Sequence, residues 1–184
     1  MFIQTEPTPN PATIKFVPGK QVLATGVHDF KSLDEAGPSP LATRLFEVDG
    51  VAGVFLGADF ISVTKGDLDW NMLKPAVMGV IMEHFMSGAP VMDGEVQDEN
   101  ANEVFDEEDR ETVDTIKQLL EEKVRPAVAQ DGGDIVFQAY KDGIVYLHMR
   151  GACSGCPSST ATLKNGIENL LKHFLPEIKE VRAA

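Results

Sequence analysis

Two cysteines separated by two residues are the feature of this sequence with the clearest chemistry. Cys153 and Cys156 are the only cysteines of the 184-residue chain, and they lie in a glycine-containing loop over residues 151–159. This spacing lets both sulfurs converge on one metal centre or on each other. Pro157 suits the first turn of a following helix, and a thiol beside a helix N-terminus has a lowered pKa. The loop therefore predicts a site for anionic sulfur.

Several uses of such a pair have to be compared. An inert structural pair is uncommon in this type of loop. A thioredoxin-like redox pair occurs in the same local context, but only 28 residues follow Cys156, which leaves no room for that fold's further strands. A zinc site could be completed on paper by His148 and His173, although both positions are typical of surface histidines. Thiol-disulfide exchange and a zinc-bridged dimer remain alternatives.

The ligand count favours a metal cluster shared between two chains. Structural zinc or a 4Fe-4S cluster takes about four ligands, whereas one chain offers two thiolates. Two chains that each contribute Cys153 and Cys156 supply four thiolates about a two-fold axis. We therefore expect a cluster that is shared between two copies of the chain.

The elements that position the loop follow from hydrophobic periodicity. An apolar stripe predicts a helix over residues 107–130, and two alternating runs, 135–140 and 144–149, predict a β-hairpin. In the second run, alternate side chains are expected to face opposite sides of the sheet. A second helix is expected over 158–174, after the cysteines. The Asp-Gly-Gly-Asp segment 131–134 is interpreted as a turn that needs a positive φ.

The first half of the chain has a similar pattern without cysteines. Apolar residues over 14–23, with a Pro-Gly turn in their middle, predict a hairpin. A Ser-Pro pair at 39–40 predicts the start of a short helix. A second hairpin is expected over 51–64 and a longer helix over 67–87. The predicted fold class is therefore α+β, with two small α/β-hairpin domains that each contain roughly a helix, a hairpin and a helix.

Charge defines the expected linker between these domains. Residues 93–109 contain nine acidic and no basic side chains, within a formal net charge of −13. We expect domains at residues 1–88 and 107–184, joined by an acidic flexible linker over 89–106. Because this surface would repel a phosphate backbone, no nucleic-acid partner is expected.

Composition also bears on the compartment. No apolar run approaches the roughly 20 residues that a membrane-spanning helix needs, so no membrane partner is expected. The N-terminal residues show no export or organelle signal. With two cysteines and no disulfide framework, the sequence favours a reducing, cytoplasmic location.

Two groups of residues resemble a known family. The run 125–135 and the segment 151–163, which contains both cysteines, resemble the C-terminal domain of NifU proteins. The head of the chain, over residues 2–5 and 8–11, resembles the N-terminal domain of Nfu proteins. Over nearly its whole length outside the linker, the chain is thus similar to Nfu-type iron-sulfur cluster scaffold and carrier proteins.

The resemblance implies a function and its ligands. In that family the two cysteines of each subunit bind a bridging 4Fe-4S cluster that is passed to apo-proteins, which implies this role for Cys153 and Cys156. It also implies self-association on cluster binding, with upstream cluster donors and apo iron-sulfur proteins as partners. Full NifU proteins contain an iron-loading scaffold domain and a ferredoxin-like domain with no counterpart in these 184 residues. The chain therefore resembles the shorter Nfu type.

Overall fold

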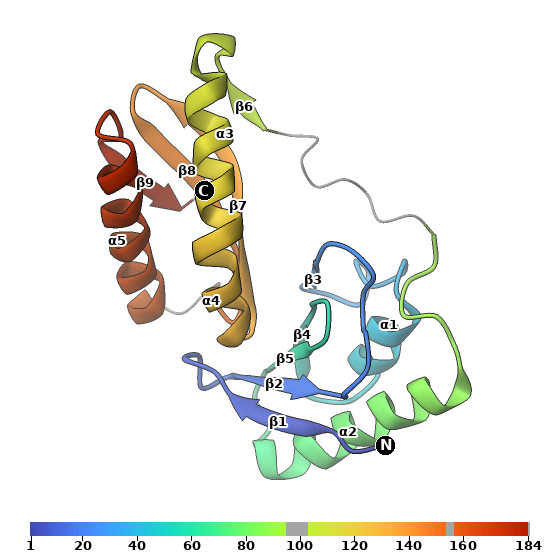
Figure 1. The fold of residues 1–184 in the computed structure, drawn as a ribbon. Coiled ribbons are helices and arrows are strands. Elements are labelled where there is room, and N and C mark those ends of the chain that lie inside the picture. Colours follow the sequence, from blue (N-terminus) through green and yellow to red (C-terminus); the bar gives the residue numbers. More distant parts are fainter. Residues whose placement is uncertain (95–102, 154–156, 184) are drawn as a thin grey trace. The chain divides into compact units, whose positions relative to one another are not determined.

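The computed structural model describes residues 1–94, 103–153 and 157–183. They form a mixed α+β structure, as the sequence predicted, in two compact units, Met1–Gln97 and Asp98–Ala184 (Figure 1). Each unit has a sheet and a hydrophobic core of its own. The middle of the predicted linker, residues 95–102, lies outside the described residues, and the predicted domain bounds stay a prediction.

The first unit is a five-stranded antiparallel sheet with two helices. The strands are ordered β1-β2-β5-β4-β3. Both helices contribute to the buried core of this unit. The bounds are β1 Gln4–Pro7, β2 Thr13–Val17, β3 His28–Phe30, α1 Pro40–Phe46, β4 Val51–Leu56, β5 Ile61–Lys65 and α2 Trp70–Ser87.

Local signals place the first helix and the second hairpin correctly. Ser39 is the N-cap of α1, where its Oγ accepts a hydrogen bond from the Ala42 N–H at 3.0 Å, and Pro40 occupies the first turn. The same hydroxyl donates to the Val91 carbonyl at 2.7 Å. Ser39 is fully buried, and these two bonds satisfy it. The hairpin of β4 and β5 also forms as predicted.

The hairpin predicted over residues 14–23 is wrong. Strand β2 pairs instead with the preceding strand β1, across a turn at residues 8–12. Polar side chains supply that turn's bonds: the Asn10 N–H donates to Thr8 Oγ1 at 3.2 Å, and the Ala12 N–H donates to Asn10 Oδ1 at 3.0 Å. Gly19 has the positive φ of a turn, but the residues after it enter the core without forming a strand. The polar turn at 8–12 was the stronger signal.

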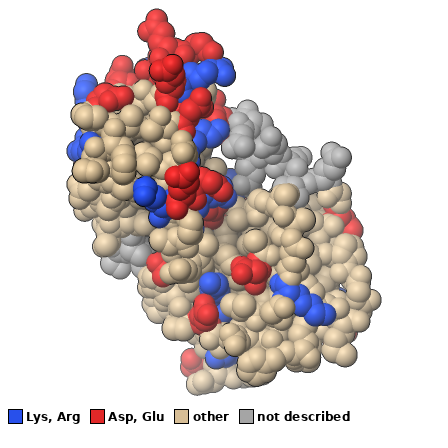
Figure 2. All heavy atoms as spheres, viewed as in Figure 1, with Lys and Arg blue, Asp and Glu red and all other residues tan. Residues whose placement is uncertain are grey.

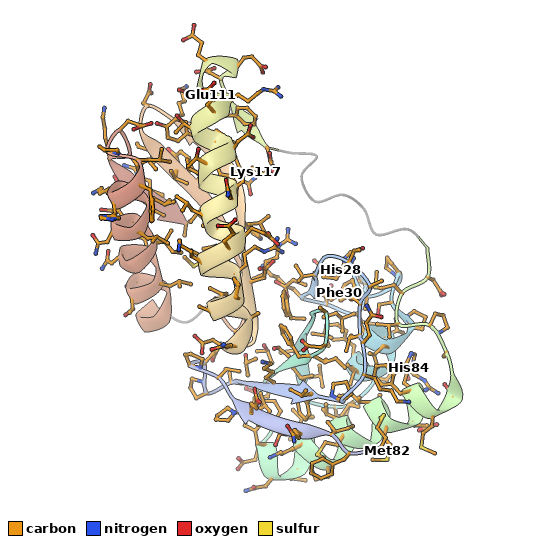
Figure 3. The ribbon with its side chains drawn as sticks, in the orientation of Figure 1. His28, Phe30, Met82, His84, Glu111 and Lys117 are labelled. Carbon is orange, nitrogen blue, oxygen red and sulfur yellow. The ribbon has the colours of Figure 1, made fainter. Side chains whose placement is uncertain are left out.

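The segment after α2 is held to the first unit. Gly88 ends the helix in the left-handed conformation, with φ of 72°. His84, which is fully buried near the end of α2, donates from Nε2–H to the Pro90 carbonyl at 3.0 Å (Figure 3). The Asp93 N–H then donates to the Pro38 carbonyl at 2.7 Å. The first residues of the predicted linker therefore contact the N-terminal core.

His84 predicts a pH dependence of the first unit's stability. Burial lowers the pKa of His84 below its ordinary value, and the charge of Arg44 lowers it further, against hydrogen bonds to backbone carbonyls that raise it. At pH values between the lowered pKa of the folded chain and the unfolded value of about 6.5, the unfolded chain binds more protons than the folded chain. Stability is therefore expected to be full above pH ~6.5 and to fall as the pH drops from there through the folded pKa.

The measurement is denaturant unfolding followed by fluorescence of Trp70, the only tryptophan, which lies in the first unit. His84→Gln keeps a donor for the Pro90 carbonyl but does not titrate, so its stability should change less between pH 7 and pH 5. His173→Gln, an exposed position in the second unit, is the control and should leave the wild-type slope unchanged. An unchanged slope in His84→Gln would refute the assignment.

The second unit is a four-stranded sheet with its helices on one face (Figure 1). The strands are ordered β6-β7-β8-β9, with β7 and β8 antiparallel and both outer pairs parallel. Strand β8 alternates as predicted, with Val145, Leu147 and Met149 buried. The bounds are β6 Val104–Phe105, a 3₁₀ turn Glu107–Asp109, α3 Arg110–Leu119, a π-helical turn Leu120–Val124, α4 Arg125–Gln130, β7 Gly133–Lys141, β8 Ile144–Gly151, α5 Pro157–Phe174 and β9 Glu180–Ala183.

The helix predicted over 107–130 forms in three parts. A π-helical turn, Leu120–Val124, separates α3 from α4. Pro126 is the second residue of α4. Because proline has no N–H and its ring collides with the preceding turn, the regular hydrogen-bond ladder cannot pass through it. The apolar stripe still faces the core on both sides of the break, as predicted. Arg125 lies at the junction.

Candidate metal centre

The structure describes only part of the cysteine loop. Cys153 comes two residues after the end of β8, and α5 begins at Pro157. Cys156 lies outside the described residues, as do Ser154 and Gly155. Strand, loop and helix thus follow one another as the sequence predicted.

Cys153 is more buried than its place in a loop suggests. Its side chain belongs to the hydrophobic core of the second unit, and the residue is 6% exposed. The motif and its spacing give no sign of this burial, which was not predicted. Burial in apolar surroundings favours the protonated thiol, whereas a helix N-terminus favours the thiolate.

The Asp-Gly-Gly-Asp turn at 131–134 packs directly against Cys153. At Gly133, an added Cβ would lie 2.7 Å from Cys153 Sγ and 2.8 Å from the Arg150 carbonyl oxygen. The Ala152 N–H donates to the Gly132 carbonyl at 3.2 Å, and Gly132 has a φ of 77°. The positive φ predicted for this turn is confirmed. Only a residue without a side chain fits the space beside the sulfur.

A buried ion pair holds the far end of the same turn. Asp134 is 3% exposed, and its two carboxylate oxygens accept hydrogen bonds from Arg125 Nε at 2.9 Å and from Nη2 at 3.0 Å. Arg125 Nη1 donates to Glu121 Oε2 at 2.6 Å. Desolvation alone would lower the pKa of Arg125, but the bonds to Asp134 and Glu121 outweigh it and raise the pKa. The pair is therefore charged and bidentate, with its carboxylate buried and the Arg125 side chain 31% exposed.

The histidines considered for a zinc site lie on different elements. His148 is on β8, on the side opposite to the buried residues, and His173 is exposed near the end of α5, with its ring edge-on to Phe174 at 5.2 Å. Within the described residues, no group of three or more His, Cys, Asp or Glu side chains is placed to hold a metal ion.

Charged side chains also line a small hollow along the β7 edge. It has a volume of about 140 Å³ and lies beside Glu103, Lys117, Glu121 and Arg125. Lys117 pairs with Glu103 at 2.8 Å, which ties the chain before β6 to α3 (Figure 3). Acidic side chains gather separately at the start of α3, at the top of the second unit (Figure 2).

Sequence comparison decides the family. Residues 3–88 match the family described as "Scaffold protein Nfu/NifU N terminal", and residues 116–182 match the "NifU-like domain". A human protein named "NFU1 iron-sulfur cluster scaffold homolog, mitochondrial" is 49% identical over 183 residues, which are 98% of this chain and 71% of that protein. The chain belongs to the Nfu/NifU family of iron-sulfur cluster scaffold proteins.

Other similar proteins cover nearly the whole chain or about half of it. The Drosophila ananassae protein of the same name is 51% identical, and the match covers 98% of this chain and 63% of that protein. Among solved structures, a NifU-like protein from Saccharomyces cerevisiae is 27% identical, covers 52% of this chain and 87% of its own, and has a TM-score of 0.47. In the described part of this chain, no helix is both long and apolar enough to cross a membrane.

Proposed function

We propose that this chain carries a 4Fe-4S cluster between two copies of itself and delivers it to apo-proteins. Membership of a scaffold family supports cluster handling. The observation that carries the finer proposal is the cysteine count: the chain has only Cys153 and Cys156, whereas a cubane cluster takes about four thiolates. Two chains related by a two-fold axis meet that requirement.

Delivery is a ligand exchange and requires no enzyme activity. Thiolates of an acceptor protein replace Cys153 and Cys156 on the cluster one after another, and the departing sulfurs leave as thiolates. A helix N-terminus beside the loop favours that charged form. The first unit contains no cysteine and cannot ligate the cluster through thiolates, so we propose that it recognises partners or positions the second unit.

Partners and compartment follow from the same proposal. Upstream donors supply the cluster, apo iron-sulfur proteins receive it, and the subunits associate when it binds. The relatives are named mitochondrial, whereas a cytoplasmic location was predicted from the sequence. The compartment of this chain stays a prediction. Either way, the pair of thiols has to be kept reduced to bind the cluster.

Anaerobic reconstitution with iron and sulfide tests the proposal. We expect a brown product with about four irons per two chains and the absorption of a 4Fe-4S cluster. Thiol-disulfide exchange is the alternative, because CxxC pairs also act as redox dithiols. An unmetallated chain that readily reduces insulin would support that alternative, and stable zinc in place of iron would support a zinc-bridged dimer.

A further inference from the structure

We infer that Arg125 and Asp134 are positioning residues for Cys153, because their ion pair fixes the turn against which the thiol lies. The inference rests on the proposed function in one respect, namely that Cys153 is a cluster ligand. It concerns residues outside the cysteine loop, on α4 and β7. The contact that carries the inference is the one between the turn and the sulfur, at Gly133.

The first step is the contact between the turn and the thiol. Gly133 leaves no room for a side chain beside Cys153 Sγ, since an added Cβ would lie 2.7 Å away. One residue earlier, the Gly132 carbonyl accepts the Ala152 N–H at 3.2 Å. The backbone of the turn therefore contacts the cysteine loop at two consecutive residues, Ala152 and Cys153. A shift of the turn by a fraction of an ångström would displace Cys153.

The ion pair between Arg125 and Asp134 holds the turn. Gly133 and Asp134 begin β7 and pair with Gly151 and Arg150 of β8, so the strand ladder holds part of the segment. Two glycines in succession still give the backbone before Asp134 more freedom than other residues would, because glycine loses more conformational freedom on ordering than any other residue. Asp134 follows them immediately, and its bidentate pair with Arg125 fixes both its position and its orientation. Arg125 is itself held by Glu121 in the π-helical turn. A chain of short contacts thus runs from the helix through Asp134 and the glycines to the thiol.

The ion pair acts mainly on the position of the turn. The Arg125 side chain is 31% exposed, and an ion pair partly open to solvent adds little net stability, because desolvation and side-chain ordering cost about as much as the attraction gives. A bidentate Arg–carboxylate pair instead imposes one planar geometry, which lysine cannot reproduce. The pair therefore sets where the turn lies more than how stable the unit is.

The reactivity of the Cys153 thiol in the full-length apo chain tests the inference without a cluster. A 6% exposed thiol is alkylated when the loop opens, so its rate reports local opening. Iodoacetamide labelling, resolved by fragment-ion mass spectrometry, gives the rate at Cys153 separately from Cys156. Under conditions far below global unfolding, Arg125→Lys and Asp134→Asn should each raise the Cys153 rate by about tenfold.

Arg110 provides a matched control. At the start of α3, before the π-helical turn, it forms a bidentate pair with Glu107 at 2.8 Å and 2.9 Å on an exposed surface. Arg110→Lys should leave the Cys153 rate unchanged. The inference is overturned if the two pair variants label at the wild-type rate, or if Arg110→Lys raises the rate as much as they do.

If both pair variants fail to fold, hydrogen exchange of the wild-type chain is the second measurement. The free energy of opening at the Ala152 amide should equal that at the Cys153 thiol. A much faster exchange of the Ala152 amide overturns the inference. Reconstitution of the folded variants should give less cluster than the wild type. If the wild type itself takes up no cluster, the proposed function fails, while the labelling rates still decide the positioning role.

Discussion

Replacing either cysteine with serine is expected to remove most of the bound cluster. A pair of Cys153→Ser or Cys156→Ser chains offers about two thiolates where a cubane takes four. Iron and sulfide analysis after anaerobic reconstitution measures the loss. A full complement of iron in either variant would contradict this prediction.

Cys153→Ser should also lower the stability of the second unit. Cys153 is buried in the core of the second unit, so Cys153→Ser places a hydroxyl in an apolar site and is expected to cost about 1–3 kcal/mol of unfolding free energy. Denaturant unfolding of the apo chain measures this cost. The cluster loss, in contrast, should be equally severe for Cys156→Ser.

Mixing wild-type and mutant chains extends this prediction. Heterodimers offer about three thiolates and should hold a weakened cluster. The amount of cluster per wild-type chain should therefore fall as mutant chain is added. A monomeric site would give a constant amount per wild-type chain, whatever the mixing ratio.

Gly133→Ala is expected to have the second largest effect. Its Cβ would lie 2.7 Å from Cys153 Sγ and 2.8 Å from the Arg150 carbonyl, and the second of these is backbone that cannot rotate away. Overpacking of this kind costs about 1–3 kcal/mol, and the displaced thiol should lower cluster content as well. Unfolding of the apo chain and iron content after reconstitution measure the two effects.

Gly166→Ala is the matched control for this variant. Gly166 lies in α5 of the same unit, and an added Cβ there meets nothing within 4 Å. Alanine in a helix interior should stabilise by about 0.5–1 kcal/mol and leave cluster content unchanged. Equal behaviour of the two alanine variants would show that the contact at Gly133 does not matter.

Local signals in the sequence predicted much of the fold. Ser39 and Pro40 marked the start of α1, and the apolar alternation in β8 assigned its buried face, because both depend on residues close in the chain. Strand pairing was harder to predict where two turns in the sequence offered the same strand different partners. Two turns were available to pair with β2, and the strength of the polar turn at 8–12 shows only when its side-chain bonds are seen.

The site was predictable in its ligands but not in its supports. The spacing of Cys153 and Cys156 suggested a metal, and the positive φ of the Gly132 turn followed from turn chemistry. The burial of Cys153 and its contact with Gly133 join segments that lie 20 residues apart, and no periodic pattern reports such a contact. Asp134 was interpreted as part of a turn, although its partner is Arg125, nine residues earlier.

The most direct test of the shared cluster is size-exclusion chromatography without oxygen, with iron measured in every fraction. The proposal predicts that iron elutes only with a dimer, at about four irons per two chains, and that removing the cluster with a chelator releases monomers or a loosely associated apo dimer. A monomer that carries about four irons would contradict it, because one chain has only two cysteines to offer.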